Sequence, residues 1–175
     1  MPRNGTDKLT TSLLACGVLG GFGFIAVFLI AGAIRPHYSP LYHHVSSLSL
    51  GDDGSIQIAN FVVTGILIIA CALGLRRALS SGRGSTWGPI LVGMFGLGLV
   101  GAGAFVTDPG FGYPPGASCG VPATVTVHGN LVASSVALFS GGYAGLFQRL
   151  SIVAGWTWIE LLTIRTTRRL SPPLD

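Results

Sequence analysis

Three long runs without a single charged residue constrain this chain more than any other feature of its sequence. They cover residues 13–34, 56–75 and 87–106. Each has about 20 residues, which is the length of an α-helix that crosses the hydrocarbon core of a bilayer. Backbone polar groups in lipid must be paired within the protein, so helices are the expected form. A fourth run, residues 124–147, predicts a fourth span, although it contains His128.

Composition supports the same class. Charged residues make up 9% of the 175 residues and hydrophobic residues 49%, whereas soluble domains carry about 25% charged residues. So few charges would not cover a water-soluble surface. We therefore predict an all-α integral membrane protein, a polytopic bundle of four to five transmembrane helices that forms a single membrane domain over residues 1–175. Its primary partner is the lipid bilayer.

The end of the chain is harder to interpret. Residues 150–164 are apolar but short for a crossing, and Glu160 interrupts them. A carboxylate at the centre of a membrane helix costs about 3 kcal/mol on insertion scales. The sequence leaves open whether this segment crosses the membrane or lies in its plane.

The distribution of basic residues predicts the orientation. With the N-terminus in the cytoplasm, most basic residues fall on the cytoplasmic side, as is typical of membrane proteins; these are Arg3, Lys8, Arg76, Arg77, Arg83 and Arg149. We expect the cytoplasmic (inner) membrane of a bacterium. The net charge of +4 does not indicate nucleic acid, because no basic patch is interleaved with aromatic residues.

The polar stretch 36–55 separates the first two runs and holds three of the four histidines. Pro36 is expected to end the first helix. Ser39 and Pro40 are a favourable start for another helix, and apolar residues then recur at helical spacing. This pattern predicts a short amphipathic helix at the membrane interface.

Four side chains are candidate site residues, because the predicted topology brings them to one outer face. His43 and Ser46 come from the stretch 36–55, Asp108 from the polar loop 107–123, and His128 from the outer turn of the fourth span. Ionisable residues at membrane depth are costly and are candidates for function.

Several kinds of chemistry fit these residue types. Two imidazoles and Asp108 suit zinc or iron(II). Ser46 with a histidine and an aspartate suits nucleophilic catalysis. A proton or solute path could be lined by His128, Asn60, Asn130 and Ser135. The cluster could instead be purely structural. The sequence identifies no cofactor or metal.

The leading hypothesis is a membrane protein whose outer polar cluster is a binding or structural network. The alternative is an intramembrane enzyme, a hydrolase or metal-dependent, that acts on a lipid-like or apolar small molecule at the outer leaflet.

Glycines are frequent, 27 in all, which is typical where membrane helices approach closely. Gly17 and Gly21 form a GxxxG pair in the first run. The third run has glycines at 93, 96, 98, 101 and 103 and is expected to be the most central helix. Such helices also favour contact with a second copy of the chain or another membrane protein.

Two motifs resemble a known family. His43, Ser46 and Leu48 match a His-x-x-Ser-x-Leu pattern after a first helix. TDPGFGYPPG followed by VHG, which includes Asp108 and His128, is similar to a second loop and the helix after it. The chain thus resembles the bacterial membrane-protein family called domain of unknown function 998. The resemblance implies a polytopic membrane protein of about six spans without an established activity, so this chain looks like a shortened member.

Overall fold

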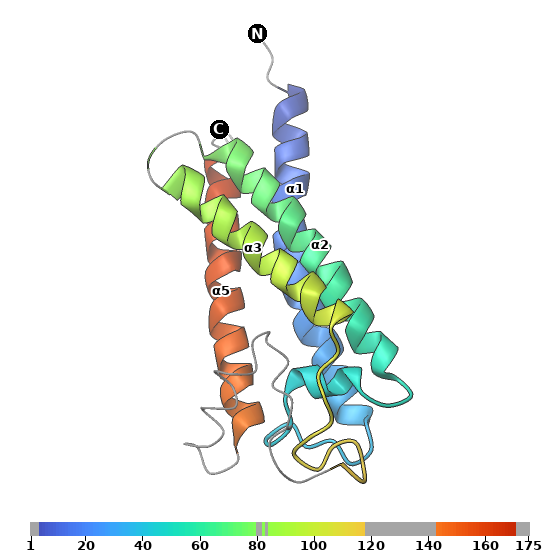
Figure 1. Cartoon of the computed structure of the whole chain (residues 1–175). Helices are drawn as coiled ribbons and strands as arrows, with labels where there is room; N and C mark the ends of the chain where they lie inside the picture. The colour runs from blue at the N-terminus through green and yellow to red at the C-terminus, as the bar shows by residue number, and fades with distance from the viewer. Residues whose placement is uncertain (1–3, 80–81, 83, 118–142, 171–175) are drawn as a thin grey trace. The chain divides into compact units, whose positions relative to one another are not determined.

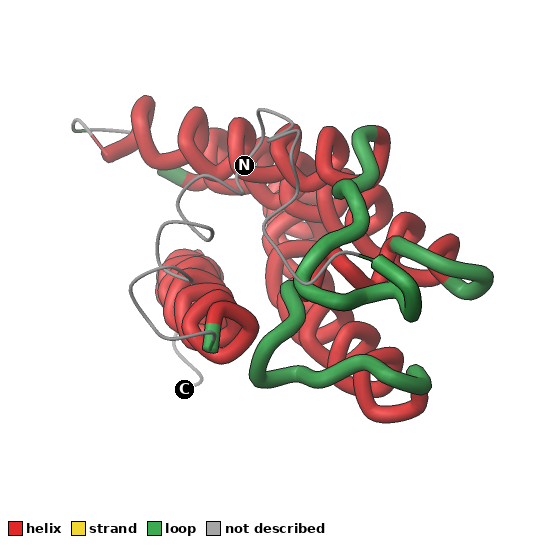
Figure 2. Tube along the Cα trace, turned by 60° about the horizontal axis from the view of Figure 1, so that its bottom comes forward, coloured by secondary structure: helices red, strands yellow, loops and turns green. Residues whose placement is uncertain are grey.

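The computed structural model describes residues 4–79, 82, 84–117 and 143–170. This part of the chain contains four α-helices, a 3-10 helix and no β-strand (Figures 1 and 2). The elements are α1 (Asn4–Ile34), η1 (Val45–Ser49), α2 (Gly54–Ala78), α3 (Gly84–Ala104) and α5 (Ala144–Leu170). The predicted all-α class is confirmed.

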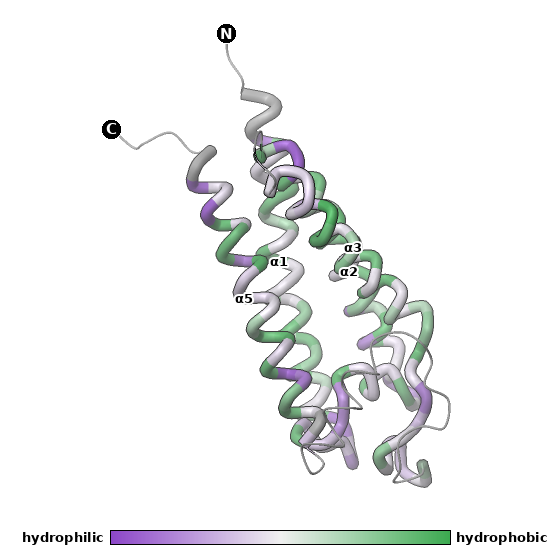
Figure 3. The backbone as a smooth tube through the Cα atoms, turned by 60° about the vertical axis from the view of Figure 1, so that its left-hand side comes forward, coloured by the Kyte–Doolittle hydropathy of each residue, from purple (hydrophilic) through white to green (hydrophobic). Residues whose placement is uncertain are grey.

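Three of these helices are long and apolar enough to cross a membrane. The candidate spans are Lys8–Ile34, Gly54–Ala78 and Gly84–Ala104. They confirm the three uncharged runs. The first span begins earlier than its run, the second is longer at both ends, and the third begins earlier and ends before Phe105. Figure 3 shows apolar residues along most of α1, α2 and α3, whereas α5 carries several polar bands. The chain is therefore a multi-pass membrane protein.

The last helix differs from the sequence prediction. Residues 150–164 were expected as a short isolated segment, but α5 is one continuous helix of 27 residues, Ala144–Leu170. It takes over the final residues of the predicted fourth span 124–147, and residues 118–142 lie outside the described part of the chain. Its polar residues lower its hydropathy without interrupting its backbone hydrogen bonds. α5 is not among the candidate spans.

The chain divides into two compact units. Unit 1 comprises Met1–Phe24, Val63–Val100 and Gly155–Asp175, and unit 2 comprises Ile25–Val62 and Gly101–Ala154. Each unit takes parts of α1, α2, α3 and α5.

Glycines bring the helices of unit 1 into close contact. A Cβ atom added at Gly65 of α2 would lie 2.6 Å from the carbonyl oxygen of Gly96 in α3, and one at Gly17 of α1 would lie 2.5 Å from Cys71 Sγ. Neither position tolerates a larger residue unless the helices separate. The predicted close contact at Gly17 and Gly21 is confirmed, because Gly21 lies against the side chains of Trp156 and Glu160 in α5.

The helix with the most glycines is not the most buried one. In the apolar 18-residue stretch that defines each candidate span, 28% of the residues of α3 are buried, compared with 50% of those of α2. Gly96 and Gly103 contact α2 closely, whereas Cβ atoms at Gly98 and Gly101 would meet nothing within 4 Å. The prediction that the third run is the most central helix was wrong. Its glycines serve one face only, and α2 is the helix that the described residues enclose.

One end of unit 1 is rich in basic side chains. The first turns of α1 and the last turns of α5 lie at this end (Figure 1). Arg77 at the end of α2 donates a hydrogen bond to Thr10 of α1, and Arg76 donates one to the Ser85 carbonyl at the start of α3. Lys8 and Arg168 are exposed. This clustering agrees with the predicted cytoplasmic side.

Candidate functional site

The first loop of unit 2, residues 35–53, is a compact structure with little regular helix. It begins with a turn in which the Ser39 carbonyl accepts hydrogen bonds from the N–H groups of Tyr42 and His43, at 3.2 and 2.8 Å. The 3-10 helix η1 follows. The predicted short helix is thus present, but it has five residues and lies inside the unit, because Val45, Ser47, Leu48 and Ser49 are all buried. It does not present a polar face to water.

Both ring nitrogens of His43 are occupied. Nδ1 accepts a hydrogen bond from the Ser39 N–H at 2.9 Å, and Nε2 lies 3.2 Å from the Phe111 carbonyl oxygen. Nδ1 must carry the lone pair to accept the first bond, so Nε2 carries the proton and donates the second. Burial lowers the pKa of His43 below its ordinary value of 6.5. His43 is therefore a neutral structural imidazole, and it has no free nitrogen for a metal or a proton-transfer step.

Phe111 holds both histidines from the second loop, residues 105–117. Its carbonyl oxygen accepts the His43 bond, and its ring lies 5.2 Å from that of His44 in an edge-to-face arrangement. The backbone φ of Phe111 is +56°, in the left-handed region that costs a non-glycine residue roughly 1 kcal/mol or more. This conformation is maintained by the surrounding contacts.

Two tyrosine rings pack against the His43 side chain. Tyr38 lies 5.4 Å from His43 and 5.5 Å from Tyr113, and His43 and Tyr113 are 5.2 Å apart, all between ring centres. The Tyr38 hydroxyl donates to the His44 carbonyl oxygen at 3.0 Å. Burial raises the pKa of Tyr38, while the nearby guanidinium of Arg149 opposes this change. Tyr38 therefore stays a phenol at neutral pH and keeps its donor.

Two arginines fasten the first loop at its two ends. Arg149 donates to the carbonyl oxygens of Pro40, His43 and Gly145 and to the Tyr38 hydroxyl. Arg35 donates to the carbonyl oxygens of Leu48 and Leu50 and to the Tyr113 hydroxyl. Hydrogen bonds from a charged donor are the strong ones. We call the set Arg35, Tyr38, His43, Phe111, Tyr113 and Arg149 the loop frame.

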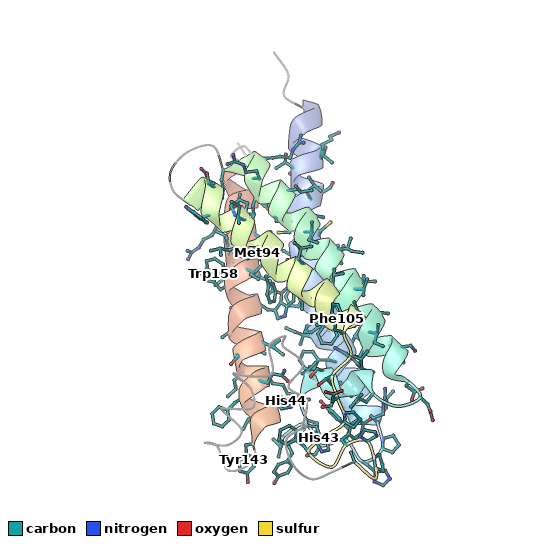
Figure 4. The ribbon with its side chains drawn as sticks, in the orientation of Figure 1. His43, His44, Met94, Phe105, Tyr143 and Trp158 are labelled. Carbon is teal, nitrogen blue, oxygen red and sulfur yellow. The ribbon has the colours of Figure 1, made fainter. Side chains whose placement is uncertain are left out.

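The side of the membrane assigned to Arg149 from the sequence was wrong. It was expected on the cytoplasmic side, yet within unit 2 it binds the first loop, which was predicted to lie outside. Two further contacts join the start of α5 to this loop: the Val45 N–H donates to Gln148 Oε1 at 2.7 Å, and the Leu146 N–H donates to the Leu41 carbonyl at 3.0 Å. Figure 4 shows Tyr143 at the same end as His43 and His44. Arg149 satisfies loop carbonyls, so its charge says nothing about the cytoplasm.

A few buried polar atoms beside the loop frame have no hydrogen-bond partner. In the first loop these are His44 Nε2, Ser46 Oγ and Ser49 Oγ, and at the start of α2 there is Gln57 Nε2. The His44 side chain is only 4% exposed. Burial, the charge of Arg149 and His43 all lower the pKa of His44. A buried polar atom without a partner costs about 1–3 kcal/mol, so this group is the part of the loop best suited to meet a ligand.

The structure separates the predicted site residues by their hydrogen bonds. His43 and Ser46 lie on the same short segment, but both ring nitrogens of His43 are hydrogen-bonded within the loop frame. The neighbouring His44, which was not predicted as a site residue, has a nitrogen without a partner. Asp108 is half-buried in the second loop, three residues before Phe111. His128 lies outside the described residues.

Metal binding finds no support in the described ranges. No group of three or more His, Cys, Asp or Glu side chains within residues 4–79, 82, 84–117 and 143–170 is arranged to hold a metal ion.

The sequence-based prediction missed the aromatic residues and the arginines of the loop frame. Phe111 and Tyr113 lie within the stretch TDPGFGYPPG, and Tyr38 lies shortly before His43. Their nearness to the two motifs is the signal in the sequence that could have indicated them.

Comparisons with known proteins give one match. The family model described as protein of unknown function (DUF998) matches residues 18–142, more than two thirds of the chain. Neither the curated proteins nor the solved structures include a significant match. The matched range contains α2, α3 and both loops with their motifs, as the resemblance of those motifs predicted. The chain belongs to the DUF998 family of proteins of unknown function.

Proposed function

We propose that this protein is a non-enzymatic membrane protein that binds a small hydroxyl-bearing polar group, such as a lipid headgroup, at its first loop. One observation carries the proposal: His44 Nε2 and Ser46 Oγ are buried without partners, next to a frame in which both His43 nitrogens and both arginines are hydrogen-bonded. Folding has fixed the loop and has left these two atoms unused.

The chemistry of the two atoms supports a neutral polar ligand. A neutral imidazole offers a donor or an acceptor at Nε2, and a serine hydroxyl offers both. Burial lowers the pKa of His44, so neither side chain is charged at neutral pH and the pair suits an uncharged group. A hydroxyl group that reaches either atom would remove the cost of leaving that atom unsatisfied.

The proposal is tested by the melting temperature of the purified chain in a neutral detergent without hydroxyl groups, with short-chain diacylglycerol added as the uncharged, hydroxyl-bearing probe. Short-chain triacylglycerol, which lacks a hydroxyl, serves as the comparison. We expect diacylglycerol to raise the melting temperature, and His44→Phe and Ser46→Ala to abolish the increase. Ser55→Ala, at an exposed position in the first turn of α2, is the matched control. An equal effect of both lipids, or variants that respond like the wild type, would contradict the proposal.

The same two atoms favour an alternative function, an intramembrane hydrolase or metal-dependent enzyme that acts on a lipid-like or apolar small molecule. Ser46 would be the nucleophile. His44 would replace His43 as the base, because both His43 nitrogens are hydrogen-bonded. Asp108 and His128 remain candidates for orienting or metal-binding roles.

A short-chain nitrophenyl ester and metal analysis of the purified protein test this alternative. Ser46→Ala, Asp108→Asn and His128→Ala would abolish turnover without loss of folding if the chain is such an enzyme. Variants that only lower the melting temperature would favour the binding or structural network.

A further inference from the structure

One carboxyl group lies within the helix packing of unit 1. Glu160 of α5 directs its Oε1 atom against Gly21 of α1, where an added Cβ atom would lie only 2.5 Å from it. The same Cβ atom would lie 3.0 Å from Trp156 Cε3. Glu160 Oε1 is buried and has no hydrogen-bond partner. The carboxyl group thus occupies the space that Gly21 leaves free.

The surroundings of Glu160 are apolar or weakly polar. Trp156, one turn earlier in α5, packs against Phe24 of α1 and Phe95 of α3, with ring centres 5.7 and 5.5 Å apart. One turn later, Thr163 lies 3.5 Å from Cys71 of α2, between Oγ1 and Sγ. Along α5, Glu160 therefore lies between two residues that pack against neighbouring helices, Trp156 before it and Thr163 after it.

Among the described residues of unit 1, no ion pair balances a charge on Glu160, and Arg165, the basic residue nearest to it along α5, is exposed. Within 9–34 of α1, 56–75 of α2 and 84–104 of α3, the only titratable side chains are the thiols of Cys16 and Cys71. In the described part of unit 1, no ion pair to Glu160 is formed and no donor reaches its Oε1. An ionised carboxylate in such a place is far more costly than the neutral acid.

The depth of the group adds to this argument. Gly21 lies at the middle of the candidate span Lys8–Ile34, so its neighbour Glu160 is far from both ends of that span. Acidic residues at this depth bind ions or protons, or pair with a cation. Since the described residues form no ion pair with Glu160, the proton is the ligand that fits. Glu160 remains partly exposed, so its carboxyl group can exchange protons with its surroundings.

We propose that Glu160 is a proton-binding site in the membrane-spanning part of unit 1, whose carboxyl group is protonated at neutral pH and rests against Gly21. Gly21 is the positioning residue, because any side chain there would displace the carboxyl group. The inference is independent of the first loop and of any ligand bound there.

A hydrophobic carbodiimide tests the proposal on the full-length protein in detergent. This reagent takes up the acidic proton on one nitrogen while the carboxyl oxygen adds to its central carbon, so it labels protonated carboxyl groups in apolar surroundings. Mass spectrometry of peptides should find the adduct at Glu160 at neutral pH, with a yield that falls several-fold as the pH is raised. Asp52 and Asp53, which are exposed in the first loop, should stay unlabelled. No adduct on Glu160 in folded protein, or equal labelling of Asp52, would overturn the proposal.

Three variants keep the test independent of folding. Glu160→Gln has the shape of the protonated acid, so its melting temperature should equal that of the wild type; a marked decrease would mean that the charge is needed, and would overturn the proposal. Gly21→Ala should change the rate of labelling several-fold. Gly23→Ala, where an added Cβ atom meets nothing within 4 Å, should leave that rate unchanged. Equal rates in the two alanine variants would also overturn it.

Discussion

Arg149 donates a hydrogen bond to the hydroxyl of Tyr38, 111 residues earlier in the chain, and its guanidinium carbon lies 5.7 Å from the centre of the Tyr38 ring. The pair joins the start of α5 to the loop that follows α1. The Tyr38 hydroxyl passes the connection on by donating to the His44 carbonyl. An arginine, a tyrosine and backbone carbonyls thus fix the position of the histidines.

Replacing Arg149 by alanine should lower the free energy of unfolding by about 3 kcal/mol, because it leaves the carbonyls of Pro40 and His43 without their charged donor. Thermal unfolding in detergent measures this effect. Arg165→Ala, at an exposed position on the same helix, should cost almost nothing. Equal losses in the two variants would show that the charge of α5 matters and the carbonyl contacts do not.

Tyr38→Phe should cost about 1–2 kcal/mol, because the ring contacts stay while the hydroxyl group that links Arg149 to the His44 carbonyl is lost. The control is Tyr42→Phe, because the Tyr42 side chain is 45% exposed and stacks on Tyr143. Chemical denaturation of both variants separates the two outcomes. A Tyr38→Phe variant as stable as the wild type would mean that the ring packing alone holds the loop.

The sequence predicted α1, α2 and α3 well because an uninterrupted apolar run has one meaning at this length. It failed at α5, where Arg149 and Glu160 lower the hydropathy. Each of these two side chains has a contact within the protein: Arg149 donates hydrogen bonds to loop carbonyls, and Glu160 packs against Gly21. A hydropathy pattern registers the presence of a charge but not the group that faces it.

The candidate site was predicted in the same incomplete way. Spacing and residue type selected His43 and Ser46, but they do not distinguish His43 from His44. The difference arises from tertiary contacts: the Phe111 carbonyl reaches His43, whereas His44 meets only the ring. Long-range contacts of this kind, 68 residues apart in the chain, leave no local pattern in the sequence.

Gly65→Ala should destabilise the protein by about 1–3 kcal/mol, because the new methyl group would meet the Gly96 carbonyl and the backbone of Val100, and overpacking of a tight contact has costs of this size. Gly98→Ala in α3 is the matched control. Its methyl group would meet nothing within 4 Å, and alanine favours a helix over glycine. A comparison of melting temperatures suffices. If Gly98→Ala were the more harmful change, the α2–α3 contact described here would be wrong.

Stability should fall as the medium is acidified below pH 6.5. Burial lowers the pKa values of His43 and His44 from their ordinary value of 6.5, so the unfolded chain binds protons before the folded one does. The unfolded state then holds more protons, and the free energy of unfolding decreases with falling pH. Melting temperatures between pH 8 and pH 5 should show the decrease.

The pH dependence can be assigned to a residue. His44→Phe should flatten the profile, because it removes one of the two imidazoles that must stay neutral in the folded state. His37→Asn should leave the profile as it is, since His37 is exposed. A profile equally steep in His44→Phe and in the wild type would attribute the acid sensitivity to other groups.

The two ends of α5 should lie on opposite sides of the membrane. Its first turns bind the loop after α1 through Arg149 and Leu146, and in unit 1 its Thr163 meets Cys71 and Gly17. A helix of 27 residues is about 40 Å long, enough to cross the bilayer. In a variant without the native cysteines, a cysteine at Arg168 should react with an impermeant maleimide only after the cytoplasmic side is opened. A cysteine at His37 should react from outside in intact cells. Reaction of both positions in intact cells would mean that α5 does not cross, and that its polar residues keep it at the surface.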